Sequence, residues 1–578
     1  MIKEKVITDQ LNSKTGLPYY WKITDVNGTV HEWKEFYTGP LVLEEKEIET
    51  LCQKLLGIGM DQLLDVANQE LLPVPSLEAV GASVVIHSTT PDLKTFDGDL
   101  DKVIKEVPPM DYTSYKEARS VYLAGEGDLV VGRIEPWQAS ASLGKAKSIK
   151  IPVVDYYYIS HALLVLAEQH LSSSSQEIDQ IVAFIQANPN AVIRLYALEK
   201  EMQIFLIWLK RLAGIDHLLM DANSPEVARD WNKKSVLFPT VEDAINLSNS
   251  IKGWSAQKIL EEEAKYSLLR KQLGCVYPAL PGYTIVRENK EVATFIQQLL
   301  DAATMLQVRY GLTLGCFKAS DSGDGARIVL GVDLSDVDQL RALAKDAYKH
   351  GDAYILEPYF NYDKVDLNGE SLKVSPSAHI RWGEVATGVT LQFTEGTSWK
   401  GNIFFDEATA EKFGVSIEHY QTIVTCMEDV RKAFGNNKLG LTIAGLDFAI
   451  GTIGGFLGNE KIIGIQDPNI SFNGAECLRA FLEKTIKEQN LTTETPLYGV
   501  TRVFKPSKNC TVPVLNEAVK SFEESGYYTD TIASVPERWG MIAVAHQNIE
   551  LATAKLADLR KYLAENGLIF QEMALKTV

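Results

Sequence analysis

Apolar positions along the chain alternate between two spacings, one typical of helices and one typical of buried strands. A strand-like run at 191–198, an apolar-rich helical stretch at 199–214 and a second strand-like run at 217–220 follow one another. This order predicts a parallel sheet, whereas strand patterns dominate from 373 to 405. We therefore expect an α/β protein, with a more α+β character in its later part. Longer helical patterns lie at 44–68, 255–274, 291–310, 337–350 and 417–434.

The chain has 578 residues, which is too many for one hydrophobic core. Changes in pattern and glycine-rich turns divide it into five predicted parts. These are an N-terminal domain of unassigned role (1–120), an α/β domain (121–254), a subdomain with a small-residue loop (255–352), a subdomain with an acidic cluster (353–492) and a small C-terminal α/β domain (493–578).

Charge and composition limit the kinds of partner. The chain carries 57 Lys and Arg against 76 Asp and Glu, which gives a formal net charge of −19. Nucleic acids and anionic membranes bind basic faces, so we expect neither as a main partner. No apolar run is long enough for a membrane span, and the first residues lack the apolar core of a signal peptide. Because the six cysteines are scattered without a CxxC pair, we expect reduced thiols and a cytoplasmic protein.

A loop of small residues separates two short strand-like runs, 314–317 and 328–332. Glycine and serine allow backbone N–H groups to approach the oxygens of a ligand, and an adjacent lysine adds a positive charge for phosphate. An ordinary glycine-rich hairpin with a surface lysine would give the same pattern. The candidate phosphate-binding residues are Lys318, Ser320, Ser322, Gly323 and Gly325.

A second predicted hairpin, 446–453 and 462–466, carries acidic and amide side chains. Asp447 lies on its first strand, and Asp467 and Asn469 lie at the end of its second strand. Such positions can face each other across one surface of an antiparallel pair. Two carboxylates and an amide oxygen suit Mg²⁺. Asp-Pro-Asn is also a good turn sequence, but the upstream lysine and small-residue loop favour the metal interpretation.

The order of these features resembles the ATP-grasp superfamily over roughly residues 255 to 490. The resemblance implies an ATP site between two α+β subdomains, preceded by an α/β pre-ATP-grasp domain at 121–254. The matching stretches are Phe317-Lys318 with Ser320 to Gly325, Ile355-Leu356-Glu357 with Pro358-Tyr359-Phe360, Gly445-Leu446-Asp447-Phe448, and Asp467-Pro468-Asn469.

The resemblance also implies a role for each matching residue. Lys318 and the small-residue loop would hold the ATP phosphates, and Lys265 would be a further ATP-binding lysine. The strand that ends in Glu357, with Tyr359 just beyond it, would bind adenine. The residues of the last two matching stretches, Asp447, Asp467 and Asn469, would bind Mg²⁺.

Two positions depart from the family pattern. Ser471 and Gly445 stand where members of the superfamily carry an arginine. An arginine that stabilises an acyl-phosphate must therefore come from elsewhere. Arg381 is the first candidate and Arg327 is the second, although Arg381 also fits an ordinary surface arginine on a strand.

The resemblance implies an ATP- and Mg²⁺-dependent ligase that joins a carboxylate to an amine through an acyl-phosphate and releases ADP and phosphate. Its substrates would be small molecules such as amino acids or peptides, and the 375–377 and 399–401 stretches are similar to pheganomycin-type peptide ligases. The alternative is a catalytically inactive nucleotide-binding subunit with a regulatory or scaffold role, which the missing arginines motivate. A homodimer is the commonest expectation for oligomeric state.

Overall fold

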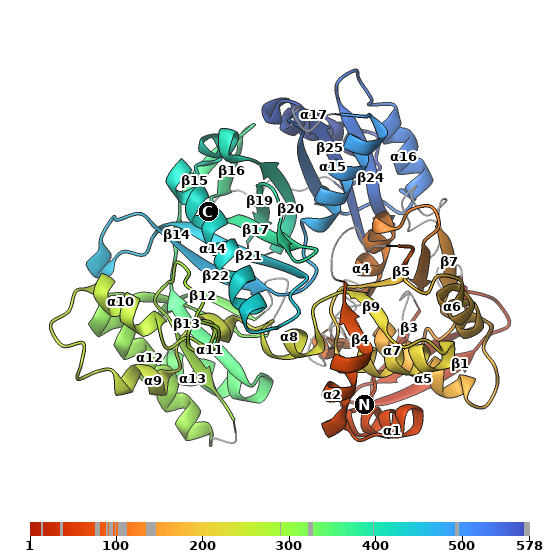
Figure 1. Cartoon of the computed structure of the whole chain (residues 1–578), viewed down its shortest axis with the longest axis horizontal. Coiled ribbons are helices and arrows are strands. Elements are labelled where there is room, and N and C mark those ends of the chain that lie inside the picture. Colours follow the sequence, from red (N-terminus) through yellow and green to blue (C-terminus); the bar gives the residue numbers. More distant parts are fainter. Residues whose placement is uncertain are drawn as a thin grey trace.

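The computed structural model describes residues 1–12, 16–34, 39–74, 81–87, 91, 96–98, 100–101, 112–133, 146–288, 291–321, 327–396, 398–491 and 496–570. The first part of the chain (red to yellow) lies beside a lobe formed by its middle part (green and cyan), and the C-terminal part (blue) packs against both (Figure 1). The architecture is mixed α/β with several sheets, as the sequence predicts. Among the described helices, none combines the length and apolarity needed to cross a lipid bilayer.

A six-stranded parallel sheet forms the core of the first part, as the strand–helix–strand pattern predicts. Two of its adjacent strands, β5 (Ser83–Ile86) and β6 (Leu129–Gly132), pair with each other although the predicted domain boundary at residue 120 lies between them in the sequence. The strands in sheet order are β4 (Leu71–Pro73), β9 (Leu218–Asp221), β8 (Val192–Leu195), β5 (Ser83–Ile86), β6 (Leu129–Gly132) and β7 (Lys147–Lys150). The surrounding helices are α1 (Glu45–Leu56), α2 (Met60–Glu70), α4 (Tyr112–Ser120), α5 (Ile159–His170), α6 (Gln176–Ala187) and α7 (Lys200–Ala213).

Two stretches that we predicted as single helices are each broken in two. Gly57 has φ +74° and ends α1, so the 44–68 pattern forms α1 and α2. In the 255–274 stretch, the Ser267 side chain accepts a hydrogen bond from the Arg270 backbone and starts a new helix. The second stretch therefore forms α10 (Ala256–Ala264) and α11 (Leu268–Leu273). Local caps override the apolar spacing in both places.

A four-stranded antiparallel sheet follows, in the order β10-β13-β11-β12. Its central pair places Cys316 opposite Glu357 and Lys318 opposite Ile355, so Lys318 and Glu357 share one face diagonally. The elements of this part are α8 (Pro225–Asp230), η4 (Lys234–Leu237), α9 (Val241–Asn246), β10 (Tyr283–Val286), α12 (Val292–Tyr310), β11 (Leu314–Ala319), β12 (Ile328–Asp333), α13 (Val337–His350) and β13 (Ala353–Pro358).

A ten-stranded antiparallel sheet follows, and its last three strands come from the C-terminal part. Its main path is β14 (Asn361–Tyr362), β21 (Ile443–Thr452), β17 (Pro376–Arg381), β19 (Val389–Glu395), β20 (Ser398–Phe405), β23 (Tyr498–Phe504), β25 (Trp539–His546) and β24 (Tyr528–Val535). Strand β18 (Glu384–Val385) pairs with β17, and β22 (Ile462–Asn469) pairs with β21. Its helices are α14 (Ile417–Asn436), α15 (Glu476–Glu488), α16 (Val512–Lys520) and α17 (Ile549–Glu565).

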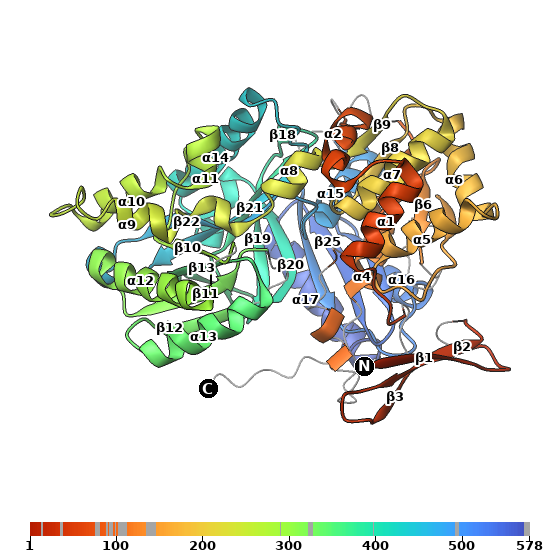
Figure 2. The same cartoon turned by 90° about the horizontal axis from the view of Figure 1, so that it is seen from below.

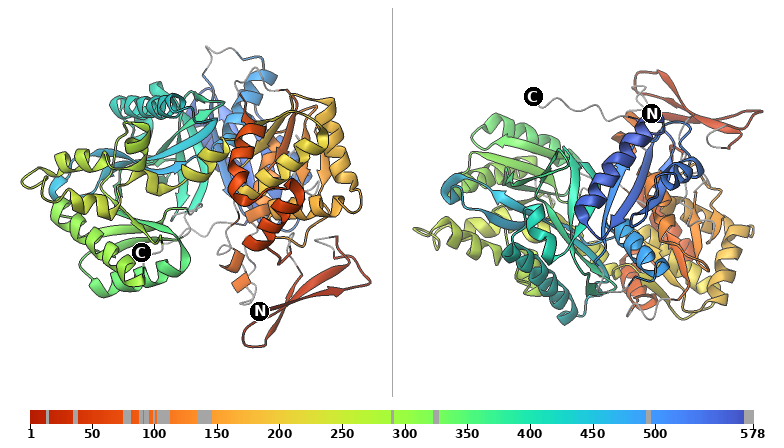
Figure 3. Two further views of the ribbon diagram at one scale, coloured as in Figure 1. Left: turned by 60° about the horizontal axis from the view of Figure 1, so that its bottom comes forward. Right: turned by 90° about the horizontal axis from the view of Figure 1, so that it is seen from above.

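Two small sheets complete the fold. Strands β1 (Ile2–Ile7), β2 (Tyr19–Thr24) and β3 (Val30–Trp33) form a sheet that projects from the body of the protein (Figures 2 and 3). A separate hairpin joins β15 (Lys364–Leu367) and β16 (Glu370–Lys373). Neither contributes to the parallel sheet or to the ten-stranded sheet.

Candidate functional site

A cleft of about 490 Å³ lies between the four-stranded sheet and the β21–β22 hairpin. Six of the sequence-predicted site residues line it, from elements that are far apart in the sequence: Lys318, Glu357, Tyr359, Asp447, Asp467 and Asn469. The cleft is also lined by Cys316, Ile328 and Leu330 from the first sheet and by Gln466 from the hairpin.

Lys318 and Glu357 form a buried ion pair on one wall of the cleft. The Lys318 Nζ lies 2.8 Å from the Glu357 Oε1 and donates to the Gln466 backbone carbonyl at 2.9 Å. Burial opposes the charge on Lys318, but the attraction of Glu357 and of other nearby groups raises its pKa. The second carboxylate oxygen of Glu357 is buried without a hydrogen-bond partner in the described part of the chain. The wall therefore offers one fixed positive charge and one unused acceptor.

Asp447, Asp467 and Asn469 lie on the opposite wall, as the sequence predicts for a hairpin. The register places Asp447 directly opposite Asp467, and the Asn469 Nδ2 donates to the Asp447 Oδ2 at 3.0 Å. Burial and then the Asp467 carboxylate raise the pKa of Asp447 to about 6. Two carboxylates held this close repel each other, and a cation between them would relieve that cost.

Lys234 connects the two walls and was not predicted from the sequence. It starts η4, its Nζ lies 3.0 Å from the Asp467 Oδ1, and its side chain is 8% exposed. The Lys234 backbone N–H donates to the Ser320 carbonyl at 2.9 Å, and the Ser235 backbone N–H donates to the Ser320 Oγ at 3.0 Å. Ser320 thus holds η4 against the end of β11. No local motif marks Lys234, because its partner lies more than two hundred residues away in the sequence.

The donor set fits Mg²⁺ in kind. Asp447 and Asp467 supply carboxylate oxygens and Asn469 supplies an amide oxygen, which are the hard ligands that Mg²⁺ prefers beside water and phosphate. Among the described residues, no group of three or more His, Cys, Asp or Glu side chains is arranged so that it could hold a metal ion by itself. The site would therefore need oxygens from a ligand to complete the coordination.

The remaining residues that we predicted for phosphate and adenine binding are Tyr359, Ser322, Gly323 and Gly325. Tyr359 lines the cleft and is 36% exposed. Ser322, Gly323 and Gly325 lie outside the described residues. The strand ends that flank them are β11 and β12, which pair in an antiparallel hairpin as the sequence predicts.

The structure does not bring Arg381, Arg327 or Lys265 to the cleft. Arg381 is buried, and its guanidinium contacts the Asp221 carboxylate through two nitrogens and the Glu476 carboxylate at 3.0 Å. These partners hold Arg381 in the packing between β17, β9 and α15. Arg381 therefore belongs to an internal ion-pair cluster with Asp221 and Glu476 and does not line the cleft, where we expected it.

The other two side chains are engaged at the surface. Arg327 has φ +55°, donates to the His350 carbonyl at 2.9 Å and lies 3.3 Å from the Asp321 carboxylate. Lys265 is 61% exposed and pairs with Glu262 one helical turn earlier. The break between α10 and α11 leaves Lys265 on the solvent side.

Arg119 lines the cleft instead, and the sequence analysis did not predict it. It lies on α4, and it is 3% exposed. The reason it was missed is topological, because α4 reaches the cleft only through the packing of the first part of the chain against α15 and β24. An arginine on a short polar helix carries no local signal of such a position.

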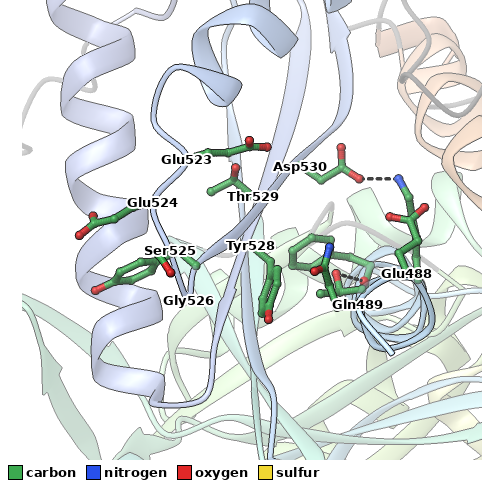
Figure 4. A pocket seen from close by; sticks show the side chains of 13 residues that line it. Glu488, Gln489, Glu523, Glu524, Ser525, Gly526, Tyr528, Thr529 and Asp530 are labelled. Atoms are coloured by element: carbon green, nitrogen blue, oxygen red, sulfur yellow. Dashed lines mark hydrogen bonds and ion pairs between the residues drawn. The ribbon is translucent and has the colours of Figure 1, made fainter. Parts of the chain in front are cut away.

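A larger cavity of about 620 Å³ lies in the C-terminal part, between α15 and the 523–530 segment (Figure 4). Its side chains are mainly acidic and polar, and Lys484 pairs with Asp530 at 2.8 Å. Glu524 pairs with Lys555 at 2.8 Å. No predicted site residue lines this cavity. Its size alone does not connect it to the chemistry of the cleft.

Comparisons with known proteins give the following matches. No protein-family model and no curated protein sequence matches this chain. An N5-carboxyaminoimidazole synthase from Aspergillus clavatus, in complex with ADP and 5-aminoimidazole ribonucleotide, is similar in structure at 11% identity and a TM-score of 0.40, over 84% of this chain and 99% of that one.

Two further solved structures are similar over smaller shares. The biotin carboxylase domain of the Hydrogenobacter thermophilus 2-oxoglutarate carboxylase has 13% identity and a TM-score of 0.43, over 78% of this chain and 88% of that one. D-alanyl-alanine synthetase A from Vibrio cholerae has 15% identity and a TM-score of 0.29, over 51% and 71%.

Proposed function

We propose that this chain is an ATP- and Mg²⁺-dependent ligase of the ATP-grasp type that joins a carboxylate to an amine. The observation that carries the proposal is the single cleft in which the buried Lys318–Glu357 pair meets Asp447, Asp467 and Asn469. One wall supplies positive charge and the other supplies oxygen ligands. That division suits a nucleoside triphosphate bound together with a divalent cation.

Residues of the first wall would bind the nucleotide. Lys318, with its raised pKa, carries a positive charge for phosphate oxygens. Ile328 and Leu330 give the cleft an apolar surface against which a planar base can pack. The unpartnered Oε2 of Glu357 can accept a hydrogen bond from an exocyclic amino group such as that of adenine.

The second wall would hold the cation through Asp447, Asp467 and Asn469. When bound, Mg²⁺ supplies positive charge that offsets the charge of the phosphates. Lys234, paired with Asp467, adds a further positive charge beside them. The contribution of the protein is to position reactants and to stabilise negative charge, since phosphoryl transfer needs little covalent help.

The proposed reaction has two steps. An oxygen of the substrate carboxylate attacks the γ-phosphorus of ATP, which forms an acyl-phosphate and releases ADP. The nitrogen of the amine then attacks the acyl carbon and displaces phosphate, which forms an amide. The amine substrate that we propose is an amino acid or a peptide.

The test is the release of ADP and phosphate from purified protein with Mg²⁺ and ATP, challenged with pools of amino acids and small carboxylic acids. We expect release that depends on a pool. In the Lys318→Ala variant, ATP affinity should fall by about tenfold to one hundredfold, because a charge-assisted hydrogen bond is lost. Lys265→Ala is the matched control, and it should bind ATP as the wild type does.

The outcomes separate the proposal from its alternatives. Equal loss of ATP affinity in both lysine variants would indicate that Lys265 also contributes to ATP binding. Unchanged ATP affinity in Lys318→Ala would contradict the proposal. Tight ATP binding without release from any pool would favour the catalytically inactive nucleotide-binding subunit.

A further inference from the structure

One region of the cleft combines a buried guanidinium with aromatic rings. We call it the aromatic region and define it by Arg119, Tyr196, Trp399, Phe472 and Asn473, all of which line the cleft. The nucleotide and metal site proposed above uses none of them. They come from α4, from the segment after β8, from β20 and from the segment after β22.

Arg119 lies among three rings. Its guanidinium carbon is 5.3 Å from the ring centroid of Phe472, 5.8 Å from that of Tyr196 and 6.0 Å from that of Trp399. Contacts with ring faces stabilise a cation and hold its planar group in place. The side chain is 3% exposed, so an anion that reached it would be largely shielded from water.

The surrounding backbone and side chains fix these rings. The Phe472 backbone N–H donates to the Tyr196 carbonyl at 3.0 Å, and the Trp399 indole N–H donates to the Asn402 side chain at 2.8 Å. The aromatic region is therefore built before any ligand arrives, which lowers the entropic cost of binding.

Asn473 adds an unused donor. Its Oδ1 accepts a hydrogen bond from the Ala475 backbone at 2.9 Å, whereas its Nδ2 is buried without an acceptor in the described part of the chain. A buried donor without an acceptor is costly, and a ligand oxygen would remove that cost. The same segment begins directly after Asn469, so the aromatic region adjoins the proposed metal ligands.

We propose that the aromatic region binds an anionic group of the substrate, with Arg119 and Asn473 as donors and the rings packed against an apolar or planar body. The chemical class is an anion, carboxylate or phosphate monoester, attached to an apolar group. The claim that this anion is the substrate of the ligase rests on the proposed function. The claim that the aromatic region binds such an anion is independent of the proposed function.

Gly445 and Asn473 also explain one departure from the family pattern. A Cβ at Gly445 would lie 3.0 Å from the Asn473 Nδ2 and 3.1 Å from His379. A large side chain at position 445 would therefore displace Asn473.

The experiment measures direct binding by ligand-observed NMR, without ATP, to the full-length protein. The probes are phenylacetate, N-acetyl-L-phenylalanine and phenyl phosphate, with phenylacetamide and N-acetyl-L-phenylalaninamide as uncharged counterparts. The variants are Arg119→Gln, Arg119→Lys and Asn473→Ala. The control is Arg229→Gln, which removes an exposed arginine whose partner is its neighbour Asp230.

We expect at least one anion to bind the wild type and Arg229→Gln equally, and to bind Arg119→Gln at least about tenfold more weakly, because a charged hydrogen bond is lost. Arg119→Lys should lie between them and the two amides should not bind. Tighter binding of phenyl phosphate than of the acids would assign a phosphate monoester, and the reverse would assign a carboxylate. If Arg119→Gln does not fold, Arg119→Lys and Asn473→Ala carry the test.

Three results would overturn the proposal. These are equal binding of the anions to wild type and to the Arg119 variants, equal binding of the amides, and no binding of any anion to the wild type. A separate ATP titration keeps the two proposals apart. Arg119→Gln should retain MgATP affinity, and if Lys318→Ala also retains it, the proposed function fails while the aromatic region stands.

Discussion

At the scale of single residues, Arg381 tests whether a buried charge serves structure or chemistry. Replacing it with methionine leaves Asp221 and Glu476 without this partner, so we expect the free energy of unfolding to fall by about 3–5 kcal/mol. Urea unfolding followed by tryptophan fluorescence measures the loss. Arg341→Met removes an exposed pair with Asp338 and should change stability by less than about 1 kcal/mol. A stable but inactive Arg381→Met protein would restore the catalytic role that the sequence suggested.

The residues that the sequence predicts well are those whose geometry is local. Asp447 and Asp467 face each other because one short hairpin sets their register, and the alternation of strand side chains is readable from the sequence. Arg381 could not be read in the same way, because its partner Asp221 is 160 residues away. Lys265 and Lys234 differ only in where the chain places them, and no spacing rule distinguishes a cleft lysine from a surface lysine.

At the scale of elements, the turn of the β21–β22 hairpin is fixed by close backbone contact with the end of α12. A Cβ on Gly455 (φ +59°) would lie 2.0 Å from the Tyr310 carbonyl oxygen, whereas one on Gly458 (φ +57°) would meet no atom within 4 Å. Positive φ costs an alanine about 1–3 kcal/mol at either position. The clash should make Gly455→Ala about 1–3 kcal/mol less stable than Gly458→Ala in urea unfolding. Equal stability of the two variants would show that the turn does not dock on α12.

Helices and hairpins are predictable to the extent that apolar spacing defines them. The stretches predicted at 291–310, 337–350 and 417–434 correspond to α12, α13 and α14 within two residues at each end. The predictions for 44–68 and 255–274 were wrong in detail, because the apolar pattern continues across Gly57 and Ser267 whereas the helix is interrupted at both residues. Spacing indicates which face is buried, and the caps determine where a helix ends.

At the scale of the whole molecule, the pairing of distant segments is what the sequence does not contain. The fold class follows from the order of strands and helices, but nothing local states that β20 pairs with β23 or that β5 lies between β6 and β8. The same distant packing brings Arg119 from α4 into the cleft. Candidate metal and phosphate residues could therefore be proposed from the sequence, whereas the aromatic region emerges only when four distant segments of the chain are assembled.

Two histidines buried in this assembly make stability depend on pH. His87 packs against Phe472 with ring centroids 4.6 Å apart, and the His379 Nδ1 lies 3.0 Å from the Arg479 guanidinium. Burial, followed by the nearby arginines, holds the pKa of both imidazoles well below the usual value. Below about pH 6.5 the unfolded chain therefore binds protons that the folded protein does not, and the folded state loses stability as the pH falls.

The size of this loss follows from the pKa of an unfolded histidine. Between pH 7.5 and 5.5 each buried histidine should lower the free energy of unfolding by about 1.4 kcal/mol. Urea unfolding at both pH values should show a pH-dependent loss that is about 1.4 kcal/mol smaller in His87→Gln or His379→Gln than in the wild type, and about twice that in the double variant. His217→Gln, at the surface, is the control. If the double variant keeps the full loss, both imidazoles are protonated in the folded protein, and the packing around Phe472 and Arg479 must admit a second positive charge.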